Sequence, residues 1–251
     1  MDMKKISDKG GVTKILIKGA GHVFMNSIRR AAMNAVPVFA IEDVTFYDNS
    51  SVLFDEYLAH RLGLLPIKTD PKKFKLGDKV KFTLDKEGPG TVYSKDIKTT
   101  DPVIDITEKE IPVAKLKKGQ KIKLEATAVM GVGKEHAKWQ PAIISYNQLP
   151  VVTIGKDCNL CNDCVENCSK GVLEVKANKV VLKDPLLCNL CGKCRDACKK
   201  GAFKLDYDDS SYILTVEGHG SLDTIDVLLG AANALKEKNR EFGEKIKKVG
   251  G

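Results

Sequence analysis

Eight cysteines gathered in one short stretch constrain the fold of this chain more than any other feature. All eight lie between Cys158 and Cys198, and the rest of the 251-residue chain contains none. They form two copies of the spacing C-x2-C-x2-C-x3-C, the second beginning 30 residues after the first. Neighbouring residues repeat as well, since Asn159-Leu160 and Lys170-Gly171 return 30 residues later. The sequence therefore predicts one local structure that is made twice.

The spacing of the cysteines has a chemical reason. Three cysteines at two-residue intervals wrap a tight loop around one face of a cubane cluster, and the fourth reaches the other cluster of a pair. This interpretation predicts two [4Fe–4S] clusters as cofactors. Cluster 1 takes Cys158, Cys161, Cys164 and Cys198, and cluster 2 takes Cys188, Cys191, Cys194 and Cys168.

The residues around the cysteines support a small folded unit. Val172–Val175 and Val180–Leu182 are expected to form strands joined by a turn at Ala177-Asn178. Gly192, inside the second loop, would let the backbone approach the inorganic core closely.

Two other uses of cysteine fit the pattern less well. A zinc site would need paired CxxC units separated by a spacer, whereas three cysteines here are evenly spaced. Disulfides are disfavoured because the N-terminal residues have no apolar run of the kind found in secretory signals. Residues 151–205 resemble a bacterial-type two-cluster ferredoxin. They depart from it at Ser169 and Lys199, where that family has proline, and this departure bears on the local turn and the redox potential.

The residues before the cysteines predict strand–helix units of an α+β domain. We expect a strand at Val12–Lys18 and a helix from His22 to Ala35, then a strand at Val38–Phe46 and a turn at 48–50. A second helix is expected at Asp55–Leu62, ended by Gly63. The buried stripe of the first helix is predicted to contain Val23, Phe24, Ile28, Ala31 and Ala32. Further strands are predicted at Val80–Leu84, Val103–Ile106 and Lys121–Met130.

The C-terminal segment predicts a long helix with a seam for a partner. A strand at Tyr212–Val216 is followed by Asp223, a good N-cap, and by a helix that extends to Val249. Its apolar positions alternate by three and four residues, as in an a/d heptad seam, and Asn239 occupies an a-type position, which favours one register. We expect intermolecular packing through this seam, whose interface residues are Ile225, Leu228, Leu235, Asn239, Phe242 and Ile246.

Three motifs outside the cysteine region carry a family resemblance. Asn26–Arg30 with Ile41-Glu42, then Asp55–Pro66, resemble the alpha-type subunits of multisubunit RNA polymerases. The run Glu135–Pro141 is similar to the HAKWxP segment of the archaeal and eukaryotic members. With two inserted ferredoxin motifs, the chain most resembles the archaeal branch of this alpha-type family.

The resemblance implies a non-catalytic platform subunit of the archaeal DNA-dependent RNA polymerase. Such a protein pairs with the small subunit L, docks the large subunits and contacts two small zinc-binding subunits, and it meets DNA only through the complex. The first helix and the long C-terminal helix would form the dimerisation surface. The implied fold is α+β, with a discontinuous dimerisation domain (1–47 and 206–251), a mainly β second domain (48–150) and an inserted ferredoxin-like domain (151–205).

Five further residues are candidates for assembly contacts. Taken alone, Arg29 and Arg30 are typical of a solvated helix face, His60 and Arg61 suit the dipole at a helix C-terminus, and Trp139 suits a core. The resemblance implies instead that they contact the large subunits, since paired arginines can bind carboxylates in a bidentate manner and tryptophan often anchors interfaces.

Composition and motifs exclude several classes of protein. The longest uncharged run, Trp139–Gly155, contains two prolines, so no membrane span is expected, and the protein is expected in the cytoplasm. The formal net charge of +8 is mild, and the basic runs at 68–81 and 236–248 are typical of solvated faces. No phosphate-binding glycine loop or magnesium-binding aspartate triplet is seen, so no catalytic residue is assigned. The alternative is an electron-transfer subunit of an anaerobic oxidoreductase, which explains the cysteines but not the other motifs.

Overall fold

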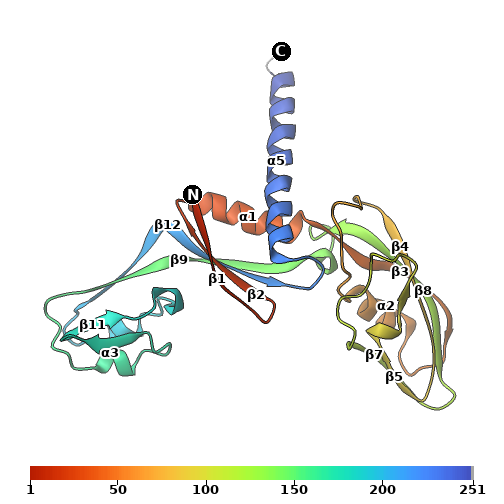
Figure 1. Ribbon diagram of the computed structural model, residues 1–251, viewed down its shortest axis with the longest axis horizontal. Helices are drawn as coiled ribbons and strands as arrows, with labels where there is room; N and C mark the ends of the chain where they lie inside the picture. Colours follow the sequence, from red (N-terminus) through yellow and green to blue (C-terminus); the bar gives the residue numbers. More distant parts are fainter. Residues whose placement is uncertain (250–251) are drawn as a thin grey trace. The chain divides into compact units, whose positions relative to one another are not determined.

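The computed structural model describes residues 1–249, which form a mixed α and β fold dominated by sheets (Figure 1). Within the described residues no helix has the length and apolar character needed to cross a membrane. The helices are α1 (His22–Asn34), α2 (Asp55–Gly63), α3 (Asp163–Glu166), α4 (Lys193–Asp196) and α5 (Thr224–Val249), with short 3-10 turns η1 (Ser94–Asp96), η2 (Ala137–Trp139) and η3 (Pro185–Leu187). The strands are β1 (Asp2–Lys9), β2 (Val12–Lys18), β3 (Pro37–Asn49), β4 (Lys79–Glu87), β5 (Gly90–Tyr93), β6 (Lys98–Thr99), β7 (Pro112–Leu116), β8 (Lys121–Val132), β9 (Ala142–Ile154), β10 (Leu173–Lys176), β11 (Lys179–Leu182) and β12 (Phe203–Gly218).

The chain divides into two compact units. The first contains residues 1–7, 14–25 and 145–215, and the second contains residues 8–13, 26–144 and those from 216 onward. A sheet of order β1-β2-β12-β9 brings strands from the two ends of the chain together. This pairing is what a domain assembled from both ends requires, although the predicted domain boundaries stay predictions.

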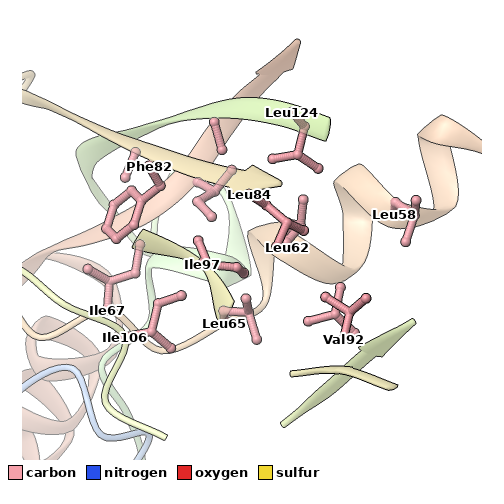
Figure 2. Packing of buried hydrophobic residues seen from close by; sticks show 14 of the residues in the cluster. Leu58, Leu62, Leu65, Ile67, Phe82, Leu84, Val92, Ile97, Ile106 and Leu124 are labelled. Atoms are coloured by element: carbon pink, nitrogen blue, oxygen red, sulfur yellow. The ribbon is translucent and has the colours of Figure 1, made fainter. Parts of the chain in front are cut away.

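The second unit contains the largest hydrophobic core. Its four-stranded sheet has the order β3-β8-β4-β6, and β4 shows strict alternation of exposed and buried residues. Leu58 and Leu62 of α2 pack against this sheet (Figure 2). Helix α2 is well suited to its place because Asp55 and Glu56 lie in its first turn and His60 and Arg61 in its last, as the helix dipole favours.

Several predicted elements form as expected. Strands occur at 80–84, 121–130 and 12–18, and the hairpin β10–β11 turns at Ala177 and Asn178, both with positive φ. The strand predicted at Tyr212–Val216 is part of the much longer β12.

Three expectations need correction, and one strand was not expected. Val103–Ile106 is not a strand, because Ile106 forms only an isolated bridge with Ile67. Val23 and Phe24 are exposed, and Met25 is buried in their place. Gly63 is the last residue of its helix and not the residue that follows it, and Leu64 is the C-cap. A Cβ at Gly63 would lie 3.3 Å from the carbonyl oxygen of Ile41, so its role is close packing. Strand β1 was not predicted.

Candidate functional site

The two cysteine loops have the same backbone conformation. Leu160 and Leu190, which occupy equivalent places in the repeat, have φ values of 59° and 53°. Two residues later, Asn162 and Gly192 have φ values of 66° and 83°. Left-handed conformations are costly for leucine. Their recurrence at the same two places confirms that the sequence repeat is a repeat of structure.

The turn after each fourth cysteine also repeats. The N–H of Gly171 donates to the carbonyl oxygen of Cys168 at 2.9 Å, and the N–H of Gly201 donates to that of Cys198 at 2.9 Å. Both glycines have positive φ, close to 60°. The turn forms although neither motif has proline after its fourth cysteine. The departure from the ferredoxin pattern therefore leaves this local structure intact.

The four ligands predicted for the second cluster line one pocket. Cys188, Cys191 and Cys194 come from the second loop, and Cys168 comes from the first motif. The remaining walls of the pocket are largely apolar. All eight cysteines are free thiols. A four-iron cubane takes one thiolate on each iron, so its ligands need to surround a cavity, and these four residues do so.

Burial and neighbouring groups shift the pKa of three of the thiols. Burial raises the pKa of Cys194, and the adjacent thiols of Cys188 and Cys168 raise it further. Burial likewise raises the pKa of Cys164, with the nearby Cys158 and Cys161 adding to the effect.

The pKa of Cys168 shifts in the opposite direction. Burial alone would raise it, but backbone N–H groups, that of Val172 foremost, stabilise the thiolate and leave the pKa lowered. A thiolate is the form that binds iron.

Within residues 1–249 no three His, Cys, Asp or Glu side chains converge on a point where they could hold a single metal ion. The cluster assignment accordingly stays a prediction, which rests on the repeat and on the pocket.

The three family motifs of the second unit meet at one place. Lys138, from the HAKWxP segment, pairs with the carboxylate of Glu42, and its ammonium also donates to the carbonyl oxygen of Ile41 at 3.1 Å. Glu42 is the extra residue of a β-bulge, since Ile41 and Asp43 pair with consecutive residues of β8. Gly63 of the α2 motif packs against the same Lys138 side chain.

Comparisons with known proteins show which family this chain resembles. Residues 44–154 match the family model described as RNA polymerase Rpb3/RpoA insert domain. The chain is 38% identical to DNA-directed RNA polymerase subunit Rpo3 of Methanosarcina acetivorans, with 96% of each chain covered. It is 37% identical to the Rpo3 of Archaeoglobus fulgidus, over 99% of this chain and 98% of the relative, and 33% identical to that of Pyrococcus horikoshii with the same coverage.

The chain belongs to the Rpo3 family. The predicted resemblance to the archaeal alpha-type subunit of RNA polymerase is thereby confirmed.

Within this Rpo3 family member, Trp139 is part of a core and not an exposed anchor. Its side chain is buried, and its indole N–H donates to the carbonyl oxygen of Val129 at 2.9 Å. The ring lies on Gly131 so closely that a Cβ there would come within 2.5 Å of it. The ammonium of Lys138 sits 4.6 Å from the ring centroid. The structure thus gives Trp139 a role inside the chain, and the interface contact predicted for it stays a prediction.

The predicted interface arginines differ in their hydrogen bonds within the chain and in their exposure. Arg29 donates to Asn26 Oδ1 at 3.0 Å and is half-buried, whereas Arg30 is exposed. Arg61 donates to the carbonyl oxygen of Pro112, but its Nε is buried and has no hydrogen-bond partner within the described residues. His60, next to it, is exposed.

An exposed apolar surface beside these residues was missed by sequence reasoning. Val52, Phe54 and Tyr57 are 71%, 80% and 51% exposed, on the turn before α2 and on its first residues. The signal that could have found them is a run of apolar residues placed directly after a turn of asparagine and serine.

The seam of α5 is partly covered and partly free. Val227 and Ala231, which lie beside the predicted seam, are buried, and Leu228 and Leu235 are half-buried. From Lys236 to Val249 every residue except Gly243 is exposed, Asn239 included. The exposed large apolar residues are Ile225, Leu229, Phe242, Ile246 and Val249, of which Leu229 was not predicted.

Proposed function

We propose that this protein is a non-catalytic assembly subunit of the archaeal RNA polymerase. It pairs with the small subunit L through α1 and α5, and it provides a platform for the large subunits and the small zinc-binding subunits. It reaches DNA only through the assembled enzyme. The observation that carries the pairing is the apolar face of α5, which the chain leaves exposed.

The exposed face is too large to be an ordinary surface. Phe242 and Ile246 are 62% and 53% exposed one turn apart, and Ile225 is 72% exposed at the other end of the helix. Apolar residues that recur at helical spacing in contact with water are typical of a helix that docks on a partner. On α1, Val23 and Phe24 are also exposed, at 78% and 41%.

Only the first turns of α5 are needed to hold it to its own unit. Gly230 lies against Val36, since a Cβ there would be 3.0 Å from the valine side chain. Val227 and Ala231 bury the same side of the helix. The later turns are therefore available to a partner.

The surface around α2 supports docking of a large subunit. The exposed Val52, Phe54 and Tyr57 lie on the turn before this helix and on its first residues. Apolar side chains of a partner would cover these residues.

The pairing is tested by a double substitution on the exposed face of α5. Phe242→Asp with Ile246→Asp should reduce co-purification with co-expressed subunit L more than tenfold, because two charges would be buried in the interface. Lys248→Asp is the matched control, since it places aspartate on the opposite side of the same turns and should leave pairing unchanged. Circular dichroism of each free subunit monitors folding. Full recovery of L with the double variant would refute the proposed interface.

The eight cysteines are proposed to hold two [4Fe–4S] clusters that support the cysteine-rich segment, residues 151–205. Bound clusters would supply iron–thiolate bonds whose formation adds folding free energy. The support for this is the repeated loop conformation and the pocket lined by Cys188, Cys191, Cys194 and Cys168. Loss of the clusters should loosen the segment and weaken docking of a large subunit.

Substitution of Cys158 and Cys188 by serine tests the role of the clusters. Iron and acid-labile sulfide should fall, and assembly with L and with the large subunits is then assayed in separate steps. Retention of L with loss of the large subunits is the expected result. Normal assembly at both steps, despite loss of iron, would refute a structural role.

The alternative function, electron transfer in an anaerobic oxidoreductase, gains no separate support from the structure. An anaerobic pull-down of the tagged chain distinguishes the two functions. Recovery of large polymerase subunits supports assembly, and recovery of flavin or hydrogenase-type subunits without polymerase supports electron transfer.

A further inference from the structure

The two cysteine loops share a backbone but not a charge. Asp163 and Lys193 occupy the same place in the repeat, as the first helical residue of α3 and of α4. Lys156 and Asp157, directly before the first cysteine of their motif, correspond to the uncharged Leu186 and Leu187, so this pair adds no net charge. One loop therefore presents a carboxylate where the other presents an ammonium group.

The pocket of the second ligand set shows the same bias. Lys170 and Lys193 line it together with Cys168, Cys188, Cys191 and Cys194. No Asp or Glu is among the described residues that line this pocket. Lys170 has a counterpart in Lys200, so the difference between the sites arises chiefly from Lys193 and Asp163.

Arg195 and Lys199 are two further positive charges without a charged counterpart in the other motif. One lies in the second loop and the other follows a ligand of the first set, so their effects on the difference between the sites partly cancel. Arg195 of the second loop corresponds to Val165, but its guanidinium pairs with Asp196 at 2.9 Å, which reduces its field. Lys199 follows Cys198, a ligand of the first set, where Ser169 follows Cys168. With these included, the surroundings of the second set remain the more positive.

We propose that the two sites are unequal in redox potential, with the Cys188, Cys191, Cys194 and Cys168 site accepting an electron first, and that Asp163 and Lys193 set this order. The inference rests on the proposal that both sites hold [4Fe–4S] clusters. Each site takes one electron, which adds one negative charge to a centre held by four thiolates. Positive neighbours favour the reduced form and carboxylates disfavour it.

Solvent limits the size of the effect but not its direction. Lys193 is exposed and Asp163 is half-buried, so both charges are screened. With one electron per protein molecule, we expect it at the second site about tenfold more often than at the first.

A redox titration of the full-length chain, reconstituted anaerobically and monitored by electron paramagnetic resonance, tests the order. Lys193→Asp should lower the midpoint of the first reduction step, and Asp163→Lys should raise that of the second. Combining the two substitutions should reverse the order of reduction. Lys193→Gln, the milder variant, should shift the first step in the same direction by less.

Lys176→Asp is the matched control, because it makes the same change of charge at the end of β10 and does not line the pocket. It should leave both midpoints where they are in the unmodified protein. The inference would be overturned if Lys193→Asp, with full iron and sulfide contents, left the midpoint potentials unchanged. It would also be overturned if the control shifted them equally. Failure to incorporate iron and sulfide in the unmodified protein would overturn the cluster proposal together with it, and the pairing through α5 would stand.

Discussion

The part of the second unit built on the sheet β3-β8-β4-β6 and helix α2, called the sheet domain here, buries far more apolar surface than the cysteine-rich segment. The core around β3, β4, β8 and α2 consists of twenty-one buried hydrophobic residues, many of them isoleucine and leucine. The core of the cysteine-rich segment consists of four, Cys164, Leu173, Val180 and Phe203, with the remaining cysteines partly buried around it. Burial of apolar surface is the main favourable term in folding, so the two regions cannot be stabilised in the same way.

This difference teaches where the stability of each region comes from. The sheet domain can fold on burial and hydrogen bonds alone, as domains with a full core do. The segment pays for two left-handed leucines and many ordered loop residues with little burial in return. The proposed clusters, if they bind only the folded form, would supply the missing free energy.

Removal of iron should give the largest effect and fall on one region only. After anaerobic chelation, or in Cys188→Ser, backbone amides in residues 158–198 should exchange with solvent at least a hundredfold faster, because the cluster-bound form would be lost. Amides of β4 and β8 should keep their protection. Hydrogen exchange with mass spectrometry measures both regions in one sample. Equal loss of protection in the sheet domain would contradict the comparison.

Truncation of Phe82 should be the largest single effect on the sheet domain. Its ring is fully buried in the core (Figure 2), so Phe82→Ala should cost about 3–5 kcal/mol of unfolding free energy. Lys81→Ala is the control on the same strand, where the side chain points outward and pairs with Glu125 on the surface, and it should leave the unfolding free energy almost unchanged. Urea denaturation followed by tryptophan fluorescence reports both, since Trp139 belongs to this unit.

A methyl group added at Gly131 should cost less than the loss of Phe82. The new Cβ would lie 2.5 Å from the Trp139 ring, so Gly131→Ala should destabilise the sheet domain by about 1–3 kcal/mol. The smaller side chain of Trp139→Leu in the same chain should recover part of that loss, which circular dichroism of urea unfolding measures as a coupling energy. Gly243→Ala serves as control, because an added Cβ there meets nothing within 4 Å on an exposed helix, and it should stabilise slightly.

Strands with one buried face could be predicted because apolar and polar residues alternate in their sequence. In β4, Val80, Phe82 and Leu84 are buried, and the residues between them are exposed. Strand β1 shows no such pattern, since five of the eight residues in DMKKISDK are charged and the strand lies at the edge of its sheet. It was missed because its hydrogen bonds to β2, and not its side chains, define it.

The strand predicted at Val103–Ile106 does not form, and the reason is the opposite one. The segment is apolar enough for a strand, but Asp101 accepts hydrogen bonds from the N–H groups of Val103 and Ile104, which turns the chain locally. Ile104 and Ile106 reach the core all the same. Burial was predictable there, and backbone pairing was not.

The candidate sites also include one that the sequence pattern predicts and one that depends on residues brought together only by the fold. Cysteine spacing predicts that the first motif supplies the fourth ligand of the second site, and the fold places Cys168 in the pocket of the second motif, while the cluster itself stays a prediction. The place of Trp139 depended on Gly131, which lies on a strand that only the folded sheet brings beneath the ring. An exposed anchor and a core tryptophan look alike until that partner is known.

The smallest expected effect lies in the sheet domain and depends on pH. Burial alone would raise the pKa of Asp96, but the ammonium of Lys86 at 2.8 Å and the N–H of Tyr93 at 2.9 Å outweigh it and leave that pKa below its ordinary value. A carboxyl with a lowered pKa contributes stability above the pKa of the unfolded chain, about 3.9, and loses it as the pH falls through the folded pKa.

Asp96→Asn should therefore cost about 1 kcal/mol at pH 7 and nothing once the carboxyl of the unmodified protein is protonated. The two stability curves should converge below about pH 4, as urea midpoints measured from pH 7 to pH 3 would show. Asp85→Asn removes a more exposed carboxyl that pairs with Lys121 at 3.3 Å, and its cost should stay below about 0.5 kcal/mol. A difference for Asp96→Asn that persists unchanged in acid would mean that its packing, and not its charge, supports the turn.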